Sequence, residues 1–235
     1  IYYEYPTQLQ TVGSIAQTLL DSHEIYTYMG GTYLKGAVDN NYAWYNGFIW
    51  RIMGVNSDGS VRLITEEDVS SITWGTDTGA QDYNGSYIKD WVNNYFLTRL
   101  KSREDIVETS FCEDSTLVTS SSSARTTCTT PVTAMAGILS IDEYNLSGGS
   151  SSYLVNGQFY WTLTPNTNAD VWTIYNTGGV NSGKVRYLSG IRVVISVSPD
   201  MIITAGNGTL TGNSDTEYVL NQSLNVETET LKESA

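Results

Sequence analysis

The sequence predicts an α+β domain in which short strands outnumber helices. Three stretches near the middle of the chain carry the clearest strand signal. Phe159–Leu163 alternates large apolar and small polar residues, and Val171–Tyr175 is rich in β-branched and aromatic residues. Ile191–Val197 is almost entirely β-branched, which suits a strand buried on both faces. Pro165 ends the first of these runs because proline cannot donate a hydrogen bond to a sheet.

A second group of strands is predicted nearer the start of the chain. Asn46-Gly47 and Asp58-Gly59 are dipeptides that tight hairpin turns favour, because both central residues of such a turn need positive φ. The strands around them therefore form an antiparallel meander, and two further short strands are predicted near the end of the chain. The predicted strands are Thr32–Lys35, Tyr42–Tyr45, Phe48–Val55, Ser60–Thr65, Met201–Thr204 and Tyr218–Leu220.

Two helices are predicted from apolar residues spaced three and four apart. Ser86–Leu100 begins with a good N-cap residue and carries one aromatic and aliphatic stripe. Thr7–Ser22 has the same spacing, although Gly13 weakens the prediction. This first helix either packs on its own domain or is part of a longer segment that packs on a neighbouring subunit. A single helical turn is predicted at Asp142–Leu146.

The composition is typical of a β-rich extracellular protein. Only 16% of the residues are charged, and polarity comes from hydroxyl and amide side chains together with 17 tyrosines and 6 tryptophans. The net charge of −13 argues against nucleic acid and anionic membrane surfaces as partners, because their phosphates would be repelled. No stretch approaches the roughly 18 apolar residues of a transmembrane helix.

Cys112 and Cys128, the only two cysteines, lie in a loop rich in serine and threonine. A disulfide between them would close a loop of about 15 residues and stabilise the fold by roughly 3 kcal/mol. The alternative is a pair of buried or reactive thiols. A polar loop is a poor place to bury a thiol, so we expect the disulfide and, with it, an oxidising compartment.

The strands after Phe159 resemble a C-type-lectin-like domain, of the kind found on bacterial surface proteins and in the formylglycine-generating-enzyme superfamily. The resemblance rests on Tyr160-Trp161-Thr162, Thr164-Pro165, Trp172, Gly178 and Ile191-Arg192-Val193-Val194, where Val194 replaces a frequent proline. It implies mixed and antiparallel sheets with flanking helices, to which the N-terminal helix is an extension. The copper-binding cysteines of the formylglycine-generating enzymes lie near the end of the domain, so that activity is not expected here.

A longer match, from about Tyr33 to Leu220, resembles an uncharacterised surface-domain family of Gram-positive bacteria. Its motifs here include Leu34-Lys35-Gly36, Asn40-Asn41-Tyr42, Trp50-Arg51-Ile52, Arg62-Leu63-Ile64 and Leu139–Tyr144, and Glu217 replaces a proline near the end. We therefore divide the chain into an N-terminal extension (1–30), a C-type-lectin-like surface domain (31–220) and an acidic, polar tail (221–235).

No catalytic motif stands out. His23 is the only histidine and has no serine or cysteine motif around it. The adjacent carboxylates Glu66-Glu67 and Asp142-Glu143 would point to opposite sides of a strand, so we expect them to be solvated surface charges rather than a hydrolytic pair. We expect no enzyme and no cofactor.

A ligand site is predicted in the loops between residues 165 and 187. Asn166, Asn168 and Asp170 offer oxygen atoms at alternate positions, but the glycine and distal glutamate of a calcium loop are missing, so no metal is expected. Trp172, Tyr175 and Tyr187 form either a platform for a sugar or protein ligand, or part of the core.

The favoured function is a non-enzymatic structural subunit of a bacterial cell-surface assembly such as a pilus or filament. Self-association would use aromatic and apolar residues of the N-terminal segment by strand addition between subunits. These residues are Ile1, Tyr2, Tyr3, Tyr5, Leu9 and Val12. The alternative is a monomeric surface adhesin that recognises a glycan or a protein through the 165–187 loops.

Overall fold

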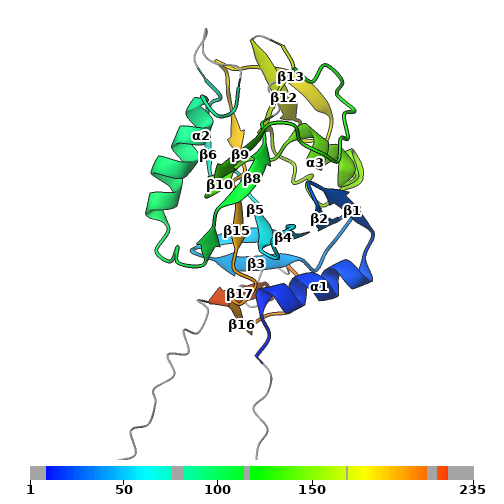
Figure 1. The fold of residues 1–235 in the computed structure, drawn as a ribbon, viewed down its shortest axis with the longest axis vertical. Coiled ribbons are helices and arrows are strands. Elements are labelled where there is room, and N and C mark those ends of the chain that lie inside the picture. Colours follow the sequence, from blue (N-terminus) through cyan, green and yellow to red (C-terminus); the bar gives the residue numbers. More distant parts are fainter. Residues whose placement is uncertain (1–8, 76–81, 114–116, 168, 211–215, 222–235) are drawn as a thin grey trace, which may run out of the picture.

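The computed structural model describes residues 9–75, 82–113, 117–167, 169–210 and 216–221 and has an α+β fold (Figure 1). Most of the core lies between and around two sheets. The larger sheet has ten strands, and β1, β2 and β7 join it beside its main path. In sheet order, the main path is β10 (Ala136–Gly137), β15 (Val194–Val197), β5 (Val61–Thr65), β4 (Phe48–Val55), β3 (Tyr42–Tyr45), β17 (Tyr218–Asn221) and β16 (Ile202–Ala205).

The remaining strands complete the larger sheet and build two smaller ones. β2 (Gly31–Leu34) pairs with β4 and with β1 (Ile25–Tyr28), and β7 (Ile106–Val107) pairs with β15. β8 (Thr109–Cys112) and β9 (Pro131–Ala134) form a separate two-stranded sheet. The five-stranded sheet runs in the order β13 (Val180–Lys184), β12 (Asp170–Ile174), β11 (Tyr160–Pro165), β14 (Leu188–Ile191) and β6 (Ser70–Thr73).

The predicted meander is confirmed. β3 and β4 are antiparallel, and Tyr45 faces Phe48 across the turn. The turn residues Asn46 and Gly47 both have positive φ, of 55° and 85°, as a type I′ turn requires. β1 was not predicted. A similar turn at Met29-Gly30 joins it to β2, which corresponds to the predicted strand Thr32–Lys35.

The first helix, α1 (Val12–Ser22), is shorter than predicted because Thr11 caps it. The Thr11 hydroxyl accepts a hydrogen bond from the Ser14 backbone N–H, and the Ser14 hydroxyl accepts one from the Thr11 N–H. The apolar face of α1 packs against β4 and β2 of the same chain. Val12, predicted as an assembly residue, is fully buried there and is not accessible to a neighbouring subunit in this fold.

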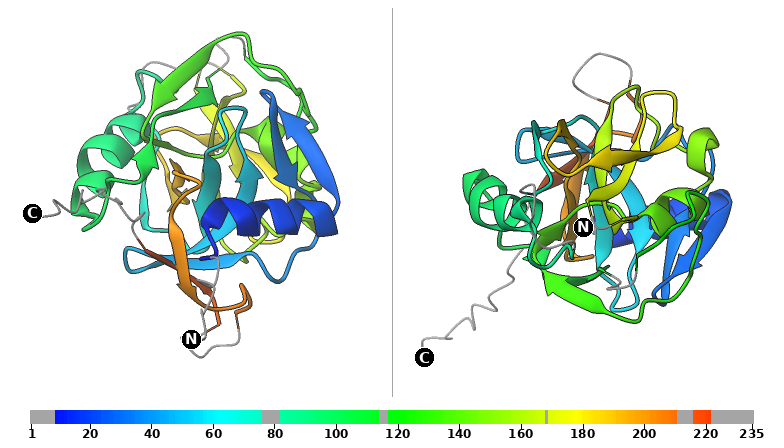
Figure 2. Two further views of the ribbon diagram at one scale, coloured as in Figure 1. Left: turned by 60° about the horizontal axis from the view of Figure 1, so that its bottom comes forward. Right: turned by 90° about the horizontal axis from the view of Figure 1, so that it is seen from above.

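The second predicted helix is present but not regular throughout. It consists of α2 (Tyr87–Trp91), a π-helical turn (Val92–Phe96) and a 3-10 turn (Leu97–Arg99). Ser86 is the N-cap, as predicted, and its hydroxyl accepts a hydrogen bond from the Lys89 N–H. The Asn93 amide donates to the Lys89 and Ala136 carbonyl oxygens, which ties the π-helical turn to β10. Figure 2 shows α1 and α2 on the outside of the sheets, well apart from each other.

The predicted strand Ile191–Val197 divides between the two sheets. Its first residue ends β14 in the five-stranded sheet, and its last four residues form β15 in the ten-stranded sheet. At the crossing, the Val193 N–H donates to the Thr65 hydroxyl and the Arg192 side chain turns into the core. The run is buried on both faces, as its composition predicts, but it is not a single strand.

The predicted disulfide is confirmed, because Cys112 at the end of β8 is bonded to Cys128. The helical turn predicted at 142–146 is also present as α3 (Ile141–Leu146), followed by a 3-10 turn (Gly149–Ser151).

The two ends of the described core lie near each other. The backbone around Gln10 and Thr11 pairs with β16 at Ile202 and Ile203, and β16 is the neighbour of β17, which ends at Asn221. β16 and β17 lie at one end of the molecule, and β12 and β13 lie at the other (Figure 1). No helix in the described ranges is long and apolar enough to span a membrane.

Candidate functional site

A cleft of about 850 Å³ opens on the five-stranded sheet, and all five of its strands contribute residues to the lining. This volume is within the range of small-molecule sites. We call it the sheet cleft. Its lining combines aromatic and aliphatic side chains with hydroxyls, one amide, one carboxylate and one ammonium group. They are Asp68, Ser70, Ser71, Gln158, Phe159, Trp161, Thr173, Tyr175, Ser182, Gly183, Lys184, Tyr187, Leu188, Ser189 and Gly190.

Aromatic rings form the apolar part of the sheet cleft. The rings of Phe159 and Tyr175 are in contact, with centroids 4.9 Å apart, and both remain accessible. Tyr187 is 57% exposed and the neighbouring Leu188 is 69% exposed, an unusual degree for large apolar side chains so close together. Large apolar side chains that are exposed next to one another on a protein surface mark sites of contact with a ligand or another protein. These residues therefore indicate a contact surface.

Two glycines give the floor of the sheet cleft its shape. A Cβ atom on Gly183 would lie 2.7 Å from the Trp161 ring, and one on Gly190 would overlap the Asp68 carboxyl group. The missing side chains therefore leave room for an indole ring in one place and a carboxylate in the other. The Trp161 indole N–H donates to the Ile72 carbonyl oxygen at 2.9 Å, which fixes the ring.

Asp68 is the carboxylate that lines the sheet cleft. Its backbone N–H donates to the Gln158 side-chain oxygen at 2.8 Å, which fixes the backbone there. Its Oδ1 atom is buried and has no hydrogen-bond partner among the described residues. Burial raises the pKa of Asp68 to about 6, although the charge of Arg192 opposes this shift. Asp68 thus brings a carboxyl group to the cleft lining whose buried oxygen is not paired within the described residues.

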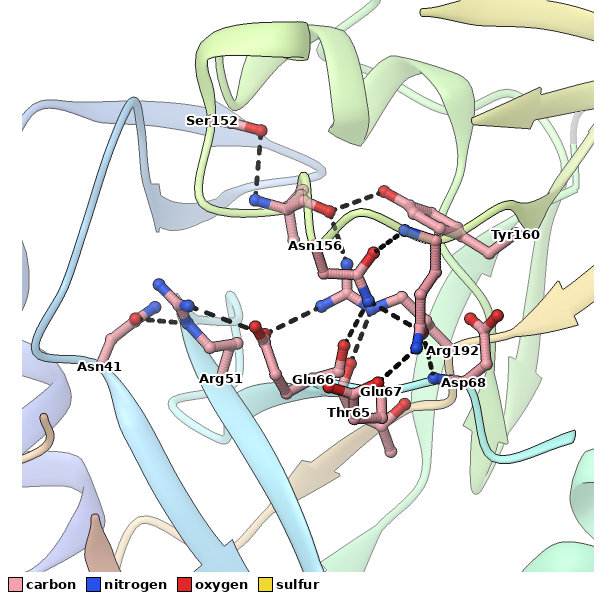
Figure 3. Close-up of polar contacts among 12 residues, drawn as sticks. Asn41, Arg51, Thr65, Glu66, Glu67, Asp68, Ser152, Asn156, Tyr160 and Arg192 are labelled. Carbon is pink, nitrogen blue, oxygen red and sulfur yellow. Dashed lines mark hydrogen bonds and ion pairs between the residues drawn. The ribbon is translucent and has the colours of Figure 1, made fainter. Parts of the chain in front are cut away.

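A buried ionic network holds the segment that carries Asp68 (Figure 3). Glu66 Oε2 lies 3.7 Å from Arg51 Nη1 and 3.5 Å from Arg192 Nη2, so that one carboxylate bridges two guanidinium groups. Arg192 Nε donates to the Thr65 carbonyl oxygen at 2.7 Å, and its Nη1 donates to that of Leu154 at 2.6 Å. Arg192 therefore joins the 65–68 segment, the 152–158 segment and the crossing between the two sheets.

The acidic pairs are mostly not solvated, which corrects the sequence prediction. Glu143 is buried and lies 2.9 Å from Arg62 Nη2. Asp142 is buried and accepts from the Arg125 guanidinium at 2.7 Å and from the Ser123 hydroxyl. Glu66 is largely buried in the network of Figure 3. Only Glu67 is an exposed charge.

The structure separates the predicted ligand residues. Tyr175 and Tyr187 line the sheet cleft. Trp172 does not, because it is only 8% exposed and its indole N–H donates to the Val118 carbonyl oxygen at 2.7 Å. Trp172 therefore belongs to the core rather than to a ligand platform, the two alternatives that the sequence left open. Asn168 lies outside the described residues.

The predicted oxygen-rich loop does not form a ligand set in the described residues. Asn166 is buried beside the sheet rather than directed into the cleft lining. Asp170 accepts from Lys184 Nζ at 2.9 Å and from the Ser182 hydroxyl, so its carboxylate is already engaged. Among the described residues, no group of three His, Cys, Asp or Glu side chains is placed to hold a metal ion.

Sequence reasoning missed Asp68, Gln158, Phe159 and Leu188. These residues come from three separate segments that meet only when β6, β11 and β14 pair. The exposure of Phe159 sets it apart from the buried large residues of β11, but this exposure is a property of the fold and has no mark in the sequence. Nothing near Asp68 in the sequence points to a cleft.

The predicted assembly residues are placed as follows. Leu9 is 57% exposed at the start of the described chain, and Val12 is in the core. Ile1, Tyr2, Tyr3 and Tyr5 lie outside the described residues.

His23 lies at the end of α1, where Nδ1 is 3.0 Å from the Leu19 carbonyl oxygen. That position suits a helix-end contact.

No protein-family model matches the chain, and no curated protein or solved structure matches it either. The family resemblance therefore stays a prediction, and the function must be argued from the site.

Proposed function

We propose that the chain is a non-enzymatic, extracellular binding module of C-type-lectin-like architecture that recognises a saccharide through the sheet cleft. The observation that carries this proposal is the composition of the cleft. Exposed aromatic rings stand beside a carboxylate, an amide and several hydroxyls in one open cavity of about 850 Å³. A sugar ring has an apolar face of C–H groups and an edge of hydroxyls, so it complements both parts of this lining.

The position of the sheet cleft also supports a binding role. The cleft lies on the five-stranded sheet, whereas Thr11 and Asn221 lie at the end formed by β16 and β17 (Figure 1). Any segment attached at these ends would lie at the opposite end of the molecule from β12 and β13, which contribute to the cleft lining. That arrangement suits a module displayed on a surface.

Two further features support the extracellular and C-type-lectin-like parts of the proposal. The Cys112–Cys128 disulfide is typical of proteins exported to an oxidising compartment. β11 and β12, which carry the Tyr160-Trp161-Thr162 and Trp172 motifs, are neighbours in a small sheet, as the resemblance implies. The Gram-positive surface family remains the source we propose for such a module.

The test is a glycan array followed by titration calorimetry with the best glycan. We expect Tyr187→Ala to weaken binding about tenfold or more, because it removes an exposed ring that would stack on the sugar. Tyr87→Ala is the matched control, since Tyr87 is similarly exposed but lies on α2 and does not line the sheet cleft. Equal affinities for the two variants, or no glycan bound by the wild type, would contradict the proposal.

A structural subunit of a surface assembly is the second candidate. One observation favours it: the Ile203 N–H donates to the Gln10 carbonyl oxygen, and Thr11 bridges to Ile202. The N-terminal segment thus adds itself to the edge of the ten-stranded sheet beside β16. The same pairing made with the β16 edge of a neighbouring subunit would link copies into a filament. Ordered polymers of the purified full chain, lost on removal of the N-terminal segment, would support this candidate.

A further inference from the structure

The charges that line the sheet cleft are not balanced within the chain. Lys184 is the cation of the lining, and its Nζ atom is already paired with Asp170 at 2.9 Å. Arg192 influences Asp68, but its side chain is buried and its donors are directed to Thr65, Leu154 and Glu66. Asp68 is therefore left with a buried oxygen that has no hydrogen-bond partner among the described residues.

The surroundings of this carboxylate favour a cation over a neutral donor. Aromatic ring faces attract ammonium groups, and the attraction grows when water is displaced. Phe159, Trp161, Tyr175 and Tyr187 line the same cavity as Asp68. A cavity lined by a carboxylate and by accessible aromatic rings is a suitable receptor for an ammonium group, which can donate to the carboxylate and rest against a ring.

We propose that the saccharide bound in the sheet cleft is an amino sugar, whose ammonium group pairs with the carboxylate of Asp68 in the cleft lining. This inference rests on the proposed function. An acidic sugar would face the Asp68 carboxylate without a free cation in the lining to offset it. A neutral sugar would donate hydroxyl hydrogen bonds but would leave the carboxylate charge uncompensated.

The burial of Asp68 also favours a cationic ligand. Its raised pKa, about 6, shows that the charged form is held in an unfavourable environment when the cleft is empty. An ammonium ligand would stabilise that form. Gly190 leaves room for the carboxyl group, because a Cβ atom there would overlap Asp68 Oδ2.

The experiment compares two ligands that differ only at the amine. Titration calorimetry at neutral pH and near-physiological salt would measure the glucosamine tetramer and the N-acetylglucosamine tetramer. We expect the wild type to prefer the amine tetramer about tenfold or more, the size expected for a hydrogen bond to a charged group. Asp68→Asn should abolish this preference, because it keeps the shape of the side chain but removes the charge.

Asp200→Asn is the control for general attraction between an acidic protein and a polycation. Asp200 is exposed, lies between β15 and β16 and does not line the sheet cleft. It should leave the preference unchanged, whereas an equal loss in both variants would overturn the inference.

The two proposals fail in different ways. If the wild type binds both tetramers equally, or binds neither but binds another glycan that Tyr187→Ala weakens, the amino-sugar inference is wrong and the binding module stands. If no glycan of any class binds, both are wrong.

Discussion

Asp68 shows how a single residue in the sheet cleft acts against stability. Its pKa is raised by burial from 3.8 to about 6, so the folded chain binds this proton more tightly than the unfolded chain does. The contribution of Asp68 to the free energy of unfolding therefore falls as pH rises from about 4 to about 6. At neutral pH the residue destabilises the fold, a trade that functional sites often show.

We expect Asp68→Asn to raise the free energy of unfolding at neutral pH, since it removes the buried charge and keeps the side-chain shape. The gain should shrink as pH falls through 6 and should vanish below about 4, where Asp68 is protonated in both states. Urea unfolding followed by circular dichroism at several pH values measures it, with Asp200→Asn as the exposed control. A variant that is less stable than the wild type at neutral pH would show that Asp68 has a stabilising partner.

The sequence indicated some of the charged residues around the site, but it did not indicate which of them form pairs. Arg51, Arg62 and Arg192 all lie in motifs that the sequence brings to notice, yet each is buried against a carboxylate or carbonyl oxygen from elsewhere in the chain. Arg192 and Glu66 are 126 residues apart. Local spacing cannot indicate a contact of this separation, so the carboxylates were expected to be solvated.

Among the elements, the loop closed by the disulfide offers a direct test. Cys112 and Cys128 are 16 residues apart, and a loop of about this length corresponds to roughly 3 kcal/mol in the chain-entropy account. We expect the double variant Cys112→Ser/Cys128→Ser to lose about that much in urea unfolding. A reducing agent should destabilise the wild type similarly and leave the variant unchanged, and a loss below about 0.5 kcal/mol would contradict the estimate.

The strands that could be predicted are those whose composition matches their burial. β3 and β4 agree with prediction to the residue, because a turn with positive φ separates two strand-prone segments rich in aromatic residues. β13 was missed, since an edge strand of sequence VNSGK is largely polar and partly exposed, as a loop would be. The 191–197 run was predicted as a single strand because nothing in its composition marks the point where Arg192 turns inward.

At the scale of the whole molecule, the assembly candidate makes a separate prediction. Deleting residues 1–10 removes the Gln10 acceptor of Ile203 but keeps Thr11, which caps α1. We expect any polymers of the full chain to disappear while the core stays folded, as measured by negative-stain microscopy and circular dichroism. Removal of residues 222–235 is the control, and polymers that survive the N-terminal deletion would contradict this candidate.

The α+β class was accessible from the sequence, whereas the cleft was not. The class follows from local patterns of strands, turns and caps. The sheet cleft requires β6, β11 and β14 to meet, and these strands come from distant parts of the chain. Two of the predicted ligand residues, Tyr175 and Tyr187, do lie in it, because they flank the paired strands β12 and β13, which contribute to its lining.

The crossing of residues 191–197 from one sheet to the other has a mechanical consequence. A module tethered near Thr11 or Asn221 and holding a fixed ligand in the sheet cleft would be stretched between its two ends. Part of that tension would pass through Ile191–Val197, the covalent link that runs directly from β14 into β15. The hydrogen bonds of Arg192 to Thr65 and Leu154 lie on this path, so we expect them to resist the separation of the two sheets under load.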